Sequence, residues 1–214
     1  MTAKEVQTMK SNSKKRTLRL AQMAMLIALI AVLQILATVF SKLVALPVSI
    51  TLTLVPIVVG AVLFGPLEGA ILGFSFGAIV LIAGFTGFDL VTLQSLQFSA
   101  PGTIFLVLTK GTAAGAVAGA IALPFKKKDK LYPAVFCAAA LAPLTNTLIY
   151  IVGMMTIFKG TWEGQAEEYG GMAILALIVI GMALVNFVIE MIINMVLAPS
   201  AVRIIQAVKK SKLV

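Results

Sequence analysis

The sequence predicts an all-α integral membrane protein, a bundle of six transmembrane helices with both termini in the cytoplasm. Three observations lead to this fold class. Of the 214 residues, 60% are apolar and only 12% are charged, whereas soluble domains carry about 25% charged residues. The apolar residues form runs close to the ~20 residues that cross a bilayer. Fourteen of the seventeen Lys and Arg residues lie in three short stretches that flank these runs.

The composition also excludes several classes of protein. The single cysteine, Cys137, cannot form an internal disulfide, and the chain has no CxxC pattern. The absence of histidine excludes His-dependent catalysis and His-ligated zinc. We therefore expect no enzyme, no metal site and no cofactor. The net charge is +9. Most of the Lys and Arg residues flank apolar runs, which indicates membrane topology rather than nucleic-acid binding.

The first apolar run is predicted to be a retained transmembrane helix. A basic segment, residues 1–16, precedes it, and the uncharged stretch 20–41 is long enough to span a bilayer and is followed by further spans, unlike a cleaved signal peptide. We expect a membrane domain over residues 17–205 and a basic cytoplasmic tail over residues 206–214. The predicted spans cover residues 17–40, 54–64, 69–85, 101–125, 131–158 and 171–202.

The breaks between the spans have distinct signals. Residues 42–53 contain Pro47 and are predicted to be a loop or a short extended piece near the surface. The Gly65-Pro66 pair marks a turn before the third span. Residues 86–100 are expected to be a sparsely charged connector, and residues 126–130 a basic turn. The connector 159–170 holds Trp162 and Tyr169, as membrane-interface anchors or lid residues.

Lys and Arg set the expected orientation. Six lie in residues 1–19, four in the turn between spans 4 and 5, and four in residues 203–212. The outer connectors contain only Lys42 and Lys159. Six spans place all three basic stretches on one side, which is then cytoplasmic.

Two kinds of small-residue stripe recur at four-residue spacing. Glycines in spans 3 and 4 are expected to let helix backbones pack closely, with a sliding subunit interface as the alternative. These glycines are Gly69, Gly73, Gly77, Gly111, Gly115 and Gly119. In span 1, Ala24 and Ala28 form an AxxxA pair, which is either internal packing or a docking surface.

Polar residues inside the spans are the candidates for a binding site, because such residues are costly in lipid and tend to face a cavity or a partner. Lys110 would bind a carboxylate or another anion in an outward-facing pocket, or be neutralised by Glu190 in a structural pair. Gln97, in a connector run that could cover the pocket, is a further candidate. The residues predicted to bind substrate are Lys110, Asn146, Tyr150, Asn186, Glu190 and Gln97.

The arrangement of these features resembles the substrate-binding S component of energy-coupling factor (ECF) vitamin transporters. The resemblance rests on the AxxxA first span, the segment Leu46-Pro-Val-Ser-Ile-Thr-Leu-Thr-Leu-Val-Pro56, the run Phe64-Gly-Pro-Leu-Glu-Gly69, the glycine-striped third span and the basic turn. It implies a six-helix bundle in the bacterial cell membrane that captures a vitamin from outside and topples to release it.

The same resemblance implies partners. These are a transmembrane coupling (T) subunit, contacted in this family through the AxxxA alanines that Ala24 and Ala28 match, and two ABC-type ATPases. The chain has no GxxxxGK[ST] phosphate loop of its own. Lys110 favours an anionic vitamin, with pantothenate as the first candidate, then folate, biotin or another vitamin. The alternative function is a stand-alone secondary transporter of a small anionic solute, although internal repeats, which are usual in such carriers, are absent.

Overall fold

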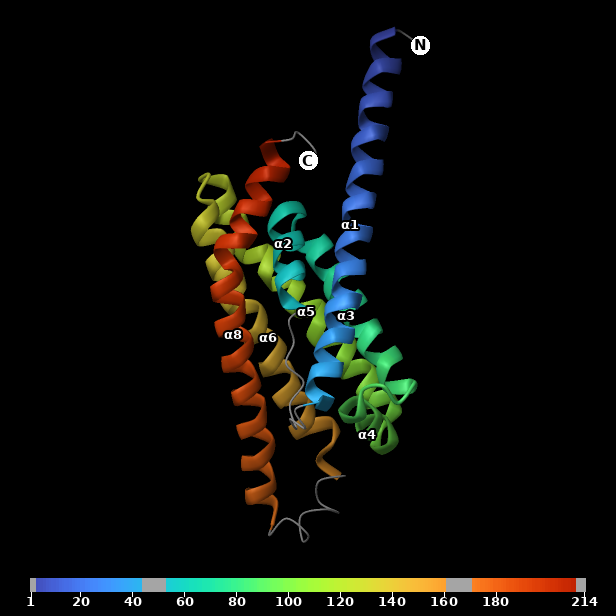
Figure 1. Ribbon diagram of the computed structural model, residues 1–214, viewed down its shortest axis with the longest axis vertical. Helices are drawn as coiled ribbons and strands as arrows, with labels where there is room; N and C mark the ends of the chain where they lie inside the picture. The colour runs from blue at the N-terminus through green and yellow to red at the C-terminus, as the bar shows by residue number, and fades with distance from the viewer. Residues whose placement is uncertain (1–2, 44–52, 161–170, 211–214) are drawn as a thin grey trace.

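The computed structural model describes residues 3–43, 53–160 and 171–210, and all the secondary-structure elements in these residues are helices, as predicted. Figure 1 shows the helices packed into an elongated bundle. The helices are α1 (Ala3–Leu43), α2 (Leu54–Phe64), α3 (Pro66–Phe85), α4 (Leu90–Phe98), α5 (Ala100–Lys127), α6 (Leu131–Ile157) and α8 (Met172–Lys210).

Five of these helices are long and apolar enough to cross a membrane. They are α1, α3, α5, α6 and α8, which match five of the six predicted spans. The sixth, α2, has 11 residues and extends about 16 Å, roughly half of the ~30 Å hydrocarbon core. The predicted count of six spans is therefore not confirmed. Helices α1 and α3 run in the same direction (Figure 1). The short α2 lies between them in the sequence and runs in the opposite direction, as a full span would.

The basic stretches gather at one end of the bundle. Figure 1 shows the N-terminal part of α1, the C-terminal part of α8 and the turn between α5 and α6 at its upper end, and α4 near the lower end. We call these the basic end and the α4 end. The charge pattern of the sequence predicted that these three segments would lie together.

The glycine stripes pack α3 against α5, which confirms internal packing. A Cβ atom added at Gly73 would collide with the carbonyl oxygen of Gly111, and one added at Gly69 would collide with that of Gly115. In the same way, a Cβ atom added at Gly111 or Gly115 of α5 would collide with the carbonyl oxygen of Gly73 or Gly69 of α3. Only glycine allows the two backbones to approach so closely.

The short helix α2 is buried and is held at its C-terminal end by two cations. Gly65 has a φ of 124°, a conformation that favours glycine, and Pro66 opens α3. Arg19 of α1 donates to the Phe64 carbonyl oxygen and pairs with Glu68. Lys126 of α5 donates to the Leu63 carbonyl oxygen at 3.0 Å. These cations satisfy helix-end carbonyls that lack partners within the helix.

The connector predicted over residues 86–100 contains a helix that the sequence analysis missed. Asp89 caps α4, because its Oδ1 atom accepts hydrogen bonds from the amides of Val91 and Thr92, each at 3.1 Å. A Cβ atom added at Gly84 would come within 2.9 Å of the Thr92 Cβ atom, so α4 packs tightly against the end of α3.

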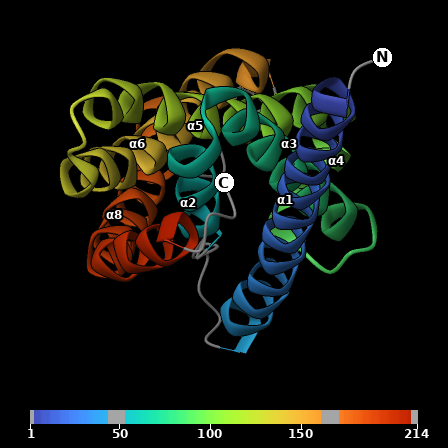
Figure 2. The same ribbon diagram turned by 90° about the horizontal axis from the view of Figure 1, so that it is seen from above.

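Helix α1 lies at the edge of the bundle, as Figure 2 shows. It is continuous from Ala3, so the predicted boundary at residue 17 is not a break in secondary structure. One face is buried and includes Met23, Ile30 and Gln34. Ala24 and Ala28 are exposed.

Candidate functional site

A cavity of about 150 Å³ lies inside the bundle and is lined by residues of α1, α3, α4, α5, α6 and α8, together with neighbouring Asp89 and Phe158. Its apolar lining includes Phe76, Leu106 and Met154. The polar residues that line it are Gln34, Asp89, Thr92, Ser95, Thr103, Lys110, Asn146, Thr147, Tyr150 and Asn186. The site thus combines an apolar wall with several polar groups, as binding pockets for small molecules do.

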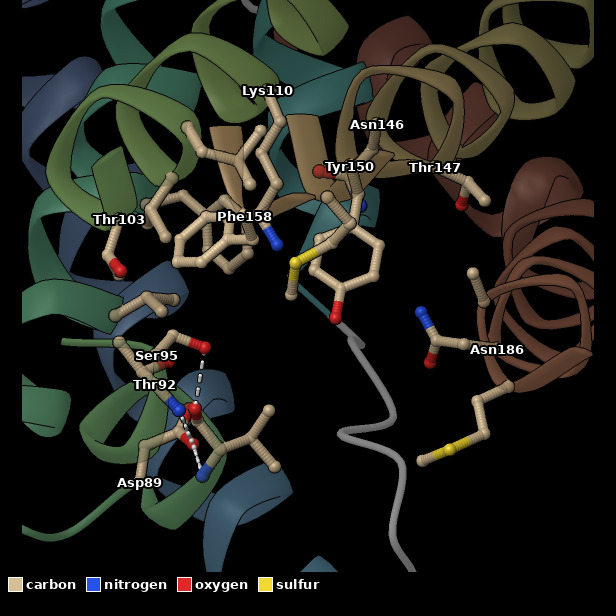
Figure 3. Close-up of a pocket in the computed structure, with 18 of the residues that line it drawn as sticks. Asp89, Thr92, Ser95, Thr103, Lys110, Asn146, Thr147, Tyr150, Phe158 and Asn186 are labelled. Atoms are coloured by element: carbon tan, nitrogen blue, oxygen red, sulfur yellow. Dashed lines mark hydrogen bonds between the residues drawn. The ribbon is translucent and has the colours of Figure 1, made fainter. Parts of the chain in front are cut away.

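Lys110 provides the cation of the cavity. It lies within α5, and its Nζ atom points into the cavity (Figure 3). The ammonium lies 5.2 Å from the centroid of the Tyr150 ring, within the range of a cation–π interaction. Lys110 makes no salt bridge within the described part of the chain, where Arg19 and Glu68 do form one. A cation in this position can receive an anionic group.

The predicted structural pair between Lys110 and Glu190 is not among the ion pairs of the described residues. Glu190 is fully buried and lies outside the cavity lining. Its Oε1 atom accepts a hydrogen bond from Asn186 Nδ2 at 2.9 Å, and its backbone carbonyl accepts one from Asn194 Nδ2 at 2.8 Å. Glu190 therefore orients Asn186, whose side chain lines the cavity, and is a supporting group rather than a lining residue.

Asn146 and Tyr150 lie one turn apart on α6, and both line the cavity. Asn146 is buried, and its Oδ1 atom has no hydrogen-bond partner in the described structure. Together with Lys110 and Asn186, these are four of the six residues predicted to bind substrate. The helical spacing predicted the shared face of Asn146 and Tyr150.

Gln97 was predicted to contact substrate, but it is exposed and lies outside the cavity lining. The reason is the helix that the connector forms. Thr92 and Ser95 of α4 face the cavity, and Gln97 follows Ser95 by two residues, a rotation of about 200° around a helix.

Six polar residues of the lining were not among the candidates, namely Gln34, Asp89, Thr92, Ser95, Thr103 and Thr147. Gln34 has an exposed fraction of 4%, and Thr103 of 2%. A signal was present for two of them: Gln34 is a polar residue within the first apolar run, and Asp89 precedes an apolar segment in the manner of a helix N-cap.

Two predictions for the outer connectors lie outside the described residues. They concern most of the loop predicted over residues 42–53, and Trp162 and Tyr169, which were predicted to be interface anchors or lid residues. Among the residues that the structure does describe, no group of three or more His, Cys, Asp or Glu side chains could hold a metal ion.

Comparison with known protein families gives a match over most of the chain. The family model described as ECF transporter, substrate-specific component, matches residues 18–202. This region contains all the described helices except the first part of α1 and the end of α8. No curated protein and no solved structure matches the chain.

Proposed function

The chain belongs to the family of ECF transporter substrate-specific components, and on this premise we propose that it captures a small anionic vitamin, with pantothenate as the first candidate. The family is one of transporters and not of enzymes. The apolar helices and the family together make the chain a multi-pass membrane protein. The membrane is, in this proposal, the bacterial cell membrane.

The observation that carries the choice of an anion is Lys110. Its ammonium faces the cavity, and in the described structure it contacts the Tyr150 ring rather than a carboxylate. A charge removed from water requires a counter-charge, and a substrate carboxylate would supply it. Asn146, Tyr150 and Asn186 add hydrogen-bonding groups around the same cavity.

The size of the cavity favours a small vitamin. A volume of about 150 Å³ equals that of an engineered protein cavity that binds benzene. Folate, with a pterin, a benzoyl ring and a glutamate, is much larger than pantothenate, which has no ring. Biotin is only slightly larger than pantothenate and is the second candidate.

The proposed orientation places the basic end in the cytoplasm. Residues 1–16 and the tail 206–214 then lie inside the cell, because segments rich in Lys and Arg stay on the cytoplasmic side. The α4 end faces outward, and the cavity, whose wall includes α4, is then filled from outside.

The family implies partners, namely a T subunit and ATPase modules. We assign the T subunit to the exposed face of α1 that carries Ala24 and Ala28, because small residues let another helix approach closely in lipid. Two ABC-type ATPases complete the proposed importer.

Calorimetric titration of the purified chain with pantothenate, biotin and folate tests the proposed function. We expect saturable binding of pantothenate, weaker binding of biotin and none of folate. Absence of binding by every vitamin in the panel would contradict the proposal. Strong binding of folate alone would agree with a transport function but would refute pantothenate as the substrate.

A further inference from the structure

One side of the cavity carries hydrogen-bonding groups that Lys110 and its neighbours do not use. Figure 3 shows Asp89, Thr92, Ser95 and Thr103 on one side, with Tyr150 and Asn186 opposite them. The lining also includes Gln34 of α1. Three separate parts of the chain, α1, the start of α4 and α5, therefore contribute polar groups to the cavity wall.

Two of these groups are buried without a partner. The Oε1 atom of Gln34 and the Oγ1 atom of Thr103 make no hydrogen bond in the described structure, although both residues are more than nine-tenths buried. Buried polar atoms are nearly always hydrogen-bonded, so each such exception requires an explanation. A ligand group that enters the cavity would supply the missing bonds.

Asp89 adds an acceptor beside them. Its Oδ1 atom caps α4 by accepting two backbone hydrogen bonds. Its second carboxylate oxygen makes no hydrogen bond to the described part of the chain, and the residue lines the cavity while 5% exposed. A carboxylate can accept several hydrogen bonds at once, so capping leaves Asp89 able to bind a donor on the ligand.

The chemistry of the three groups favours hydroxyls. The Gln34 Oε1 atom and the Asp89 carboxylate accept hydrogen bonds, whereas the Thr103 hydroxyl can both donate and accept. A ligand hydroxyl can donate to one of the acceptors while it accepts from Thr103. An N–H group cannot do both. An ammonium would meet a single carboxylate among these three groups, that of Asp89, which already caps α4.

We propose that Gln34, Asp89 and Thr103 form a hydroxyl subsite, so that the substrate is a hydroxylated carboxylic acid with its carboxylate at Lys110 and its hydroxyls at this subsite. This inference rests on the proposed function and extends it from an anionic vitamin to a defined chemical class. Asp89 then has two roles, as the cap of α4 and as a determinant of specificity.

The test uses Asp89→Asn in the full-length chain. Asparagine caps helices as well as aspartate does, so α4 is retained while the charge is lost. The ligands are pantothenate and its dideoxy analogue, 3,3-dimethylbutanoyl-β-alanine, which keeps the carboxylate and lacks both hydroxyls. We expect the variant to bind pantothenate about tenfold to a hundredfold more weakly, the range for a lost hydrogen bond to a charged group. Binding of the analogue should be unchanged.

Thr103→Val gives an independent test. Valine has nearly the same shape without the hydroxyl, so it removes a buried polar atom that has no partner. The ligand-free variant should therefore melt at the same or a higher temperature, while pantothenate binding weakens by about threefold to tenfold and analogue binding stays constant. Gln97→Ala, on the exposed face of α4, is the control and should change neither affinity.

The outcomes separate this inference from the function on which it rests. Equal effects of Asp89→Asn on both ligands, or no effect on either, would show that Asp89 only caps the helix. Binding of biotin or folate in preference to pantothenate would overturn the hydroxyl subsite and leave the transport function intact. If the wild-type chain binds none of the three vitamins, the proposed function and the subsite both fail.

Discussion

At the scale of single residues, the cavity contains groups that are costly to bury and that the fold alone does not require. Lys110 has its charge within a membrane-spanning helix, and Gln34 and Thr103 are buried with unpaired polar atoms. Each feature lowers the stability of the empty protein. Their presence in one cavity is understandable if a ligand compensates for them.

Replacing Lys110 with methionine tests whether this residue lowers the stability of the ligand-free protein while it strengthens vitamin binding. Methionine keeps much of the side-chain volume without the charge, so the ligand-free variant should be as stable as the wild-type chain or more stable, by about 1 kcal/mol. Vitamin binding should fall at least about a hundredfold, the effect of losing a buried charged contact. Thermal unfolding and calorimetry measure the two quantities.

Lys127→Met is the matched control, because Lys127 is exposed at the basic end and loses the same charge. It should leave vitamin affinity unchanged. Loss of folding in Lys110→Met with a normal Lys127→Met variant would show that Lys110 is a structural residue.

Sequence reasoning identified four of the residues that line the cavity, for a clear physical reason. Lys110, Asn146, Tyr150 and Asn186 are polar residues within long apolar helices, where helical spacing specifies which side chains share a face. Asp89 lies in a connector, and its position depends on how α4 packs against Gly84. That contact is tertiary, so the pattern of polar and apolar residues does not reveal it.

At the scale of helices, the close contact between α3 and α5 depends on glycine. Gly73→Ala would place a Cβ atom against the carbonyl carbon of Gly111 at 2.6 Å, which the backbone can relieve only by moving. We expect destabilisation of about 2–4 kcal/mol. Thermal unfolding in detergent measures the effect, with pantothenate binding as a second readout.

Gly181→Ala is the control for this prediction. A Cβ atom at Gly181 meets nothing within 4 Å, and alanine favours a helix over glycine by about 1 kcal/mol. The control should therefore be neutral or stabilising. A tolerated Gly73→Ala variant would mean that α3 and α5 can separate without loss, and that the close packing is not required.

The two short helices mark where sequence reasoning at this scale succeeded and failed. The bounds predicted for the short second span match α2, because the Gly65-Pro66 turn is a strong local signal. The length of the predicted second span does not reveal that α2 is buried and that Arg19 and Lys126 hold its C-terminal end. Helix α4 was missed because its 9 residues were interpreted as a loop between two spans.

At the scale of the whole molecule, the proposed function requires the basic end to lie in the cytoplasm. Single-cysteine variants test this, after Cys137 is replaced with serine. Gly160→Cys, at the exposed C-terminal end of the described part that follows α6, should react with a membrane-impermeant maleimide in intact cells. Lys128→Cys, in the turn between α5 and α6, should react only after the cells are lysed. The reverse pattern would invert the proposed orientation.

Assembly with the T subunit also requires a free docking face on α1. Ala24→Trp and Ala28→Trp should abolish co-purification with the T subunit, because a large side chain blocks close helix approach. Vitamin affinity should stay within about twofold of wild type, a difference of less than 0.5 kcal/mol. Ala120→Trp, at an exposed position of α5, is the matched control and should leave the complex intact. Normal complexes with both α1 variants would refute the docking assignment.

The central claim is that this chain binds its vitamin but cannot move it without other subunits. Radiolabelled pantothenate retained by proteoliposomes that contain the chain alone tests this claim most directly. We expect retention to saturate in proportion to the amount of protein and to be independent of a proton or sodium gradient. Accumulation beyond that amount under a gradient would show that the chain is a stand-alone transporter and contradict the account.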